Sequence, residues 1–110
     1  MFATLILIPL SSAVEFSFSY PNEVKLDEPF SVTINSDSQE PHDIKIFVNR
    51  DVKTDSEIHD GEVWRSPHYY LIDVFPEKKE FLLVSHILGV TQICARLRPT
   101  GGNSYEEKCG

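Results

Sequence analysis

The sequence predicts an all-β domain, an antiparallel β-sandwich of about seven short strands. Short segments alternate apolar and polar side chains with a period of two, which is typical of strands with one buried face. Proline or glycine separates these segments, and Pro-Thr-Gly-Gly-Asn at residues 99–103 is a hairpin signal. At 110 residues the chain has room for one hydrophobic core. We therefore expect one domain, over residues 14–110.

Three strands are expected in the first half of the domain, over residues 14–20, 30–34 and 43–48. Each places its apolar side chains at every second position, so each set faces one core. Lys45 and Phe47 then point to the opposite face of the third strand. The expected inner-face residues are Val14, Phe16 and Phe18, then Phe30, Val32 and Ile34, then Ile44, Ile46 and Val48.

Residues 50–62 are polar and acidic, and we interpret them as a connection that holds at most one short edge strand. Asp60-Gly61 is a tight-turn signal within it. Trp64 and residues 68–74 form the next apolar segment, whose aromatic and β-branched residues favour a strand.

Helix competes with strand over residues 76–89. Pro76 suits the first position of a helix, and Gly89 suits its end. Residues 81–84, Phe-Leu-Leu-Val, are apolar on every side, which a helix in contact with solvent does not favour. We expect a strand here.

The last two strands, residues 91–98 and 104–109, predict a disulfide. If Gly101 and Gly102 are the central residues of a two-residue turn, Cys94 lies directly opposite Cys109. This count makes the cysteines a hydrogen-bonded pair, with Cα atoms about 5.5 Å apart, within disulfide range. The loop that the disulfide closes holds about 15 residues, which corresponds to roughly 3 kcal/mol in the chain-entropy model.

The same register pairs Arg96 with Glu107 and Arg98 with Tyr105, an ion pair and a cation over a ring. The cysteines point to the outer face of the hairpin, because the inner positions belong to apolar residues. These inner residues are Ile93, Ala95 and Leu97.

Residues 1–13 are an apolar run that ends in Ser11-Ser12-Ala13, which predicts a cleaved secretory signal. The run is shorter than the roughly 20 apolar residues of a membrane-spanning helix. No Lys or Arg precedes it, so three alternatives stay open: the start lies upstream, the signal is a weak one, or the run is a buried first strand of a cytosolic protein. A signal and a single cysteine pair imply a secreted or cell-surface protein.

The charge balance argues against two classes of partner. Ten Lys and Arg against seventeen Asp and Glu leave a net charge of -7, and the cations are scattered. Phosphate backbones and anionic membrane surfaces attract clustered cations. We expect neither nucleic acid nor a membrane surface as a partner.

No catalytic pattern is found, and no cofactor is expected. The chain has no Gly-x-Ser-x-Gly motif and no His-Glu-x-x-His motif. Its four histidines lie in separate segments, so we expect no pocket to gather them with carboxylates at catalytic or zinc-binding distance. They are His42, His59, His68 and His86.

Two weaker candidate sites come from clusters of one residue type. Five carboxylates in the acidic connection offer a calcium site, with a solvated acidic loop as the favoured alternative. They are Asp51, Asp55, Glu57, Asp60 and Glu62. Trp64, Tyr69 and Tyr70 offer an aromatic platform for a protein or carbohydrate, and the favoured alternative is that they fill the core.

Three segments resemble immunoglobulin-like modules of exported archaeal surface proteins: Tyr-Pro-Asn-Glu-Val with the strand at residues 30–32, residues 42–48, and residues 64–70. The resemblance implies a β-sandwich that acts as a spacer, adhesive unit or accessory domain, without shared catalytic residues. Both cysteines follow Trp64, whereas antibody-type domains place a Trp between two inter-sheet cysteines.

We therefore expect a non-enzymatic extracellular module that acts through its surface on a protein or carbohydrate partner. The alternative is an accessory domain of a larger secreted enzyme or cell-surface protein. The uncharged start and the finish at Cys109-Gly110 support that alternative.

Overall fold

The computed structural model describes residues 15–110, and they form an all-β fold of two antiparallel sheets. The signal expected at residues 1–13, and Val14, lie outside the described residues. The five-stranded sheet has the order β1-β2-β7-β4-β5, and the four-stranded sheet has the order β6-β3-β8-β9. The strands are β1 (Phe16–Ser19), β2 (Phe30–Ser36), β3 (His42–Val48), β4 (Ser56–His59), β5 (Trp64–Arg65), β6 (Leu71–Val74), β7 (Lys79–Ser85), β8 (Ile93–Pro99) and β9 (Glu106–Cys109).

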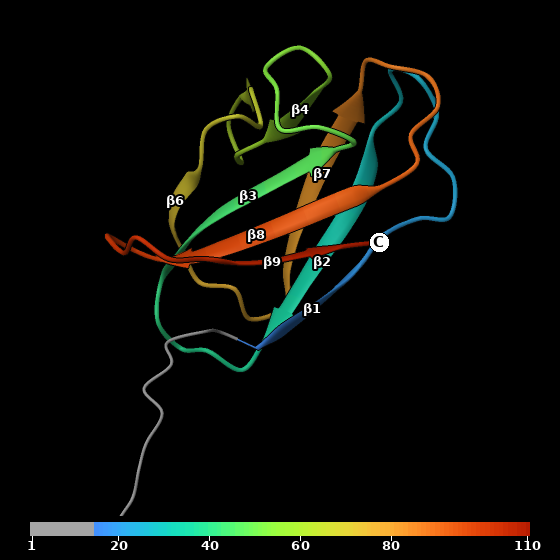
Figure 1. Ribbon diagram of the computed structural model, residues 1–110. Helices are drawn as coiled ribbons and strands as arrows, with labels where there is room; N and C mark the ends of the chain where they lie inside the picture. Colours follow the sequence, from blue (N-terminus) through green and yellow to red (C-terminus); the bar gives the residue numbers. More distant parts are fainter. Residues whose placement is uncertain (1–14) are drawn as a thin grey trace, which may run out of the picture.

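The two sheets pack face to face around one hydrophobic core (Figure 1). The long pair β2 and β7 forms the centre of one layer, and the long pair β3 and β8 forms the centre of the other. The inner-face positions expected between Phe16 and Leu97 are confirmed, because all of them belong to the core or pack against it. The fully buried members include Val32, Ile34, Ile44, Ile46, Val48, Ala95 and Leu97.

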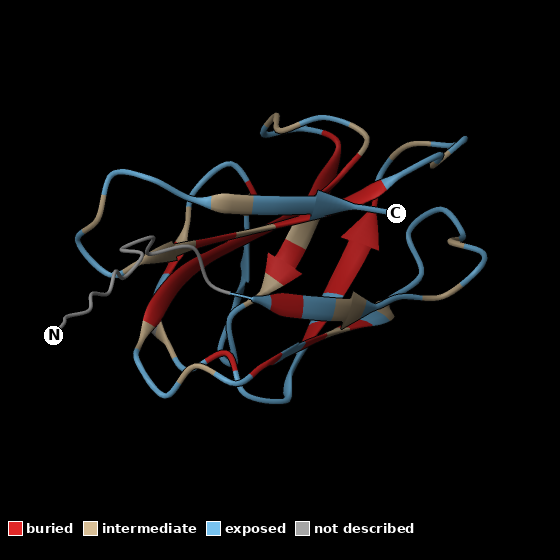
Figure 2. Cartoon of the chain, turned by 60° about the horizontal axis from the view of Figure 1, so that its bottom comes forward, coloured by how far each residue is buried: buried red, intermediate tan, exposed pale blue. Residues whose placement is uncertain are grey.

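Burial follows the predicted alternation in β2 and departs from it in β3. In β2, Val32 and Ile34 are buried while Ser31 and Asn35 are exposed. Every residue of β3 is buried, so both faces of this strand are covered. Figure 2 shows the contrast with β9, which is mostly exposed along its length up to the C-terminus.

Residues 79–85 form the strand β7, which confirms the choice of strand over helix in this segment. Phe81 and Leu83 face the core, and Leu82 between them is exposed. Within residues 15–110 there is no helix long and apolar enough to cross a lipid bilayer.

Two details of the strand prediction are wrong. The acidic connection contains β4, which lies inside the five-stranded sheet, between β7 and β5, instead of at an edge. Residues 68–70 lie in the loop before β6, because pairing with β3 begins only at Leu71. Both errors concern short strands whose limits depend on which neighbour they pair with, and a short sequence pattern does not show that neighbour.

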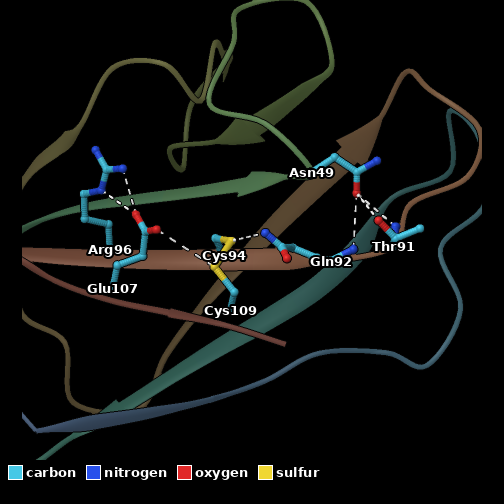
Figure 3. Close-up of a disulfide and its surroundings, with 7 residues drawn as sticks. All are labelled: Asn49, Thr91, Gln92, Cys94, Arg96, Glu107 and Cys109. Atoms are coloured by element: carbon cyan, nitrogen blue, oxygen red, sulfur yellow. Dashed lines mark hydrogen bonds and ion pairs between the residues drawn. A yellow bond between two sulfur atoms is a disulfide. The ribbon is translucent and has the colours of Figure 1, made fainter.

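Asn49 anchors the loop between β7 and β8 onto the end of β3 (Figure 3). Its backbone has a φ of 55°, a left-handed conformation that Asn tolerates better than most residues. Its Oδ1 accepts hydrogen bonds from the backbone N–H groups of Thr91 (2.9 Å) and Gln92 (3.2 Å). Its Nδ2 donates to the carbonyl of Gly89 at 3.2 Å. This single side chain therefore fixes the start of β8, two residues before Cys94.

Candidate functional site: the outer face of the four-stranded sheet

Cys94 and Cys109 lie opposite each other in the terminal hairpin and form a disulfide, as predicted (Figure 3). Their side chains point away from the core, because Ile93 and Ala95 occupy the inner face of β8. Cys94 is nevertheless almost fully buried, because the disulfide and neighbouring outer-face side chains cover it. One of these is Phe47, its direct cross-strand partner on β3.

The predicted hydrogen-bonding class of the cysteine pair is wrong. Ile93 and Gly110 exchange both backbone hydrogen bonds, at 2.9 Å each, so the next pair, Cys94 and Cys109, lies at a non-hydrogen-bonded position. Its Cα atoms are 4.0 Å apart, which agrees with the closer spacing of such pairs. The cause is the turn: Gly102 donates its N–H to the carbonyl of Pro99, so the turn is not centred on the two glycines.

Arg96 and Glu107 pair as predicted, at 2.7 Å. The predicted contact of Arg98 with Tyr105 is wrong. Tyr105 precedes β9, and its ring lies under the guanidinium of Arg96 at 4.3 Å. Arg98 instead binds Asp43 on β3, Nη2 to Oδ2, at 2.7 Å. The register of the hairpin therefore determines the contact of Arg96 with Glu107, and the neighbouring strand β3 determines the contact of Arg98 with Asp43.

The outer face of this sheet carries charged side chains that are buried. On a sheet face in contact with solvent, such side chains would be exposed. Asp43 and Lys45 of β3 stand opposite Arg98 and Arg96 of β8. The side chains of Asp43 and Lys45 are only 4% and 7% exposed. Buried charges are costly unless they are paired, and each of these has an opposite charge within 3 Å.

Asp51, in the loop between β3 and β4, covers the middle of this face. Its Oδ2 accepts a hydrogen bond from Nζ of Lys45 at 2.9 Å and lies 3.7 Å from Nη1 of Arg96. Its Oδ1 lies 3.5 Å from Nδ1 of His68, in the loop before β6. One carboxylate therefore connects two strands and one further loop.

Tyr70 adds an aromatic layer above the charges. The guanidinium of Arg98 lies 3.9 Å from the centre of the Tyr70 ring, and Nζ of Lys45 lies 4.8 Å from it. Both distances are within the range of cation–π contacts. Next to it, Tyr69 is 55% exposed and packs edge-on against His68, with Nζ of Lys53 5.4 Å from its ring centre.

We call this surface the tyrosine–arginine face and define it by Tyr69, Tyr70, Tyr105, Arg96 and Arg98. The three tyrosines come from two loops, and the arginines come from β8. Trp64, which the sequence grouped with Tyr69 and Tyr70, lies on β5 of the other sheet, with its ring edge-on to His59 at 5.0 Å. The structure thus separates Trp64 from the two tyrosines.

The five carboxylates of the acidic connection have different partners. Asp51 pairs with Lys45, Asp55 pairs with Arg50 at 3.0 Å, and Glu57 accepts a hydrogen bond from His86. Asp60 accepts backbone hydrogen bonds from the turn that follows it, and Glu62 is exposed in that turn. These hydrogen bonds are the main reason why the pKa of Asp60 is lowered.

Within residues 15–110, one group of three side chains has the spacing of metal ligands: Cys94, Glu107 and Cys109. Its two sulfur atoms are joined in the disulfide, which leaves no thiolate to bind a metal. No group drawn from the acidic connection has that spacing among the described side chains.

His86 lies at hydrogen-bonding distance from two carboxylates. Its Nδ1 lies 2.7 Å from Asp27, and its Nε2 lies 2.6 Å from Glu57. The loop before β2 passes the end of β7, where Leu26 pairs with Ser85, and this brings Asp27 to the histidine. Hydrogen bonds to Asp27 and then Glu57 raise the pKa of His86 above its ordinary 6.5.

The raised pKa makes part of the stability depend on pH. Below pH 6.5 the imidazolium is present in folded and unfolded chains alike, so the ion pairs stabilise the fold fully. This contribution is lost as the pH rises through the raised pKa of the folded state. Because the group is partly exposed, we expect less than about 1 kcal/mol. Urea denaturation of the wild type and of His86→Gln should differ more at pH 6 than at pH 9, and an equal difference at both would contradict the assignment.

Comparisons of the chain with protein-family models, with curated proteins and with solved structures found no match. The assignment of function therefore depends on the geometry of the chain itself.

Sequence reasoning named all five residues of the tyrosine–arginine face, two as an aromatic platform and three in the terminal hairpin, but it did not bring the two groups together. It also missed the contacts of Asp43, Lys45 and Asp51 that join them. Asp43, Lys45, Arg96 and Arg98 all occupy outward positions of strands that were predicted correctly. Residues of opposite charge at outward positions of two strands predict ion pairs between these strands, provided that the two strands are known to be neighbours.

Proposed function

We propose that this chain is a non-enzymatic extracellular binding module with an immunoglobulin-like fold, which contacts a protein or carbohydrate partner through its tyrosine–arginine face. One observation carries the proposal: on one sheet face, the rings of Tyr105 and Tyr70 stack against Arg96 and Arg98, which ion pairs hold in place, and Tyr105 and Tyr69 are exposed. Tyr and Arg are enriched where protein interfaces concentrate their binding energy.

The strand order supports the immunoglobulin-like part of the proposal. Immunoglobulin domains of the constant type have strands A, B, E and D in one sheet and C, F and G in the other. The orders β1-β2-β7-β4 and β3-β8-β9 correspond to these strands. The additions are β5, beside β4, and β6, which extends the second sheet next to β3.

Preorganisation supports the choice of surface. A side chain that is already held in its bound position loses little conformational freedom when a partner binds. Arg96 is held by Glu107 and Asp51, and Arg98 is held by Asp43. Tyr105 and Tyr69 stay half exposed, at 50% and 55%, so their rings remain accessible to a partner.

The disulfide is compatible with an extracellular location, where such bonds form and persist. It also holds β9 next to the tyrosine–arginine face.

The test is a binding screen of the disulfide-bonded chain against a glycan array and a panel of purified extracellular protein domains. We expect a saturable interaction that the double variant Tyr69→Ala, Tyr105→Ala weakens at least about tenfold. The matched control is Tyr20→Ala, an exposed tyrosine beyond the end of β1, and it should bind like the wild type. Binding that the double variant retains, or no saturable binding in either panel, would refute the proposal.

A further inference from the structure

A cavity of about 480 Å³ opens at the side of the sandwich between the edge strands β5 and β6. Its volume is within the range of about 300 to 1,000 Å³ that small-molecule sites occupy. The residues that matter for its chemistry are Arg65, Leu71, Val74, Phe75, Lys79 and Phe81.

The floor of the cavity is apolar. Leu71 and Phe81 are buried members of the hydrophobic core, and Val74 packs against that core. Phe75, at the end of β6, is 59% exposed and supplies an apolar wall that is open to solvent. The cavity therefore connects the space between the sheets with the surface. The apolar part of a ligand in the cavity would contact this lining and be removed from water.

Two cations point toward this apolar floor. Cross-strand partners in a sheet share a face. Arg65 pairs with Ile58, and Lys79 pairs with Ile34, and both isoleucines are buried on the inner face. The side chains of Arg65 and Lys79 therefore project from the five-stranded sheet toward the space between the sheets.

The carboxylates of the lining do not neutralise both cations. Asp60 is bound by the backbone of its own turn and reaches Arg65 only at 3.5 Å. Glu80 pairs with Thr33 and so projects to the face opposite Lys79. Among the side chains that the structure describes, none forms an ion pair with Lys79.

We propose that this cavity binds small amphiphilic carboxylates, with the apolar body against Leu71, Val74 and Phe81 and the carboxylate between Arg65 and Lys79. The carboxylate completes the charge balance at the cavity mouth, and the apolar body covers the floor of the cavity and the exposed ring of Phe75. The cavity is separate from the tyrosine–arginine face, so failure of either proposal leaves the other standing.

The experiment uses decanoate as the probe, below its micelle concentration, and the disulfide-bonded chain. Trp64 is the only tryptophan and precedes Arg65, so its fluorescence reports on the site. We expect saturable binding of decanoate and binding of decanol, which lacks the charge, that is about tenfold weaker. Lys79→Gln should weaken decanoate binding about five- to tenfold, and the matched control Lys25→Gln should leave it unchanged.

A second measurement locates the ligand. In amide NMR spectra, decanoate should shift the signals of Leu71, Val74 and Phe81, and the spectra of Lys79→Gln show whether that variant is folded. Equal affinity for decanol and decanoate would overturn the proposal, as would unchanged affinity in a folded Lys79→Gln. Shifts centred on the tyrosine–arginine face would overturn it as well.

Discussion

Replacing both cysteines by alanine, Cys94→Ala with Cys109→Ala, is expected to lower the free energy of unfolding by about 3 kcal/mol. The disulfide closes a loop with a sequence separation of 15 residues, and losing it restores conformational freedom to the unfolded chain. The strand β9 depends on this bond, because among residues 15–110 it pairs only with β8 and most of it is exposed.

Urea denaturation of the double variant and of the wild type measures this loss. Wild type treated with a reductant is the matched control, since it loses the same bond without any change of side-chain volume. We also expect amide hydrogen exchange to speed up first at Ala95 and Lys108, before it does in the central pair β3 and β8. Equal stability of the reduced and oxidised chains would show that β9 does not need the disulfide.

Asp51→Ala is expected to lower the free energy of unfolding by about 2 kcal/mol. The substitution leaves the ammonium of Lys45, whose side chain is 7% exposed, without the carboxylate oxygen that now lies at 2.9 Å. Arg96 and His68 lose the same partner. The estimate is lower than for a fully buried pair because Asp51 itself is 25% exposed.

A second substitution separates the cost of an unpaired charge from the value of the ion pair. Lys45→Met keeps most of the side-chain volume and removes the charge, so combining it with Asp51→Ala should recover much of the lost stability. Asp37→Ala, an exposed carboxylate in the loop after β2, is the matched control and should change stability by less than about 0.5 kcal/mol. Similar losses in Asp51→Ala and Asp37→Ala would show that the Lys45 charge does not depend on Asp51.

The hairpin shows how far local sequence determines a site. The register that places Cys94 opposite Cys109 and Arg96 opposite Glu107 follows from positions within 16 residues, from Cys94 to Cys109, and it is confirmed. The contacts of Arg98 were predicted wrongly, because its partners Asp43 and Tyr70 come from β3 and from the loop before β6. A pattern within one hairpin contains no information about the strand on its other side.

The sequence by itself determined the all-β class, the inner faces of the strands and the disulfide, because period-two alternation and the register of a hairpin are local properties. Only the tertiary structure decided which strands became neighbours. That choice placed β4 inside a sheet, brought Asp27 and Glu57 to His86, and gathered Asp51 and Tyr70 over the charges of β3 and β8. Such contacts join segments 20 to 60 residues apart in several cases, for example Asp43 with Arg98 at a separation of 55 and Asp27 with His86 at 59. They depend on how the two layers stack and on which loops cross them, and residue spacing along the chain does not encode either.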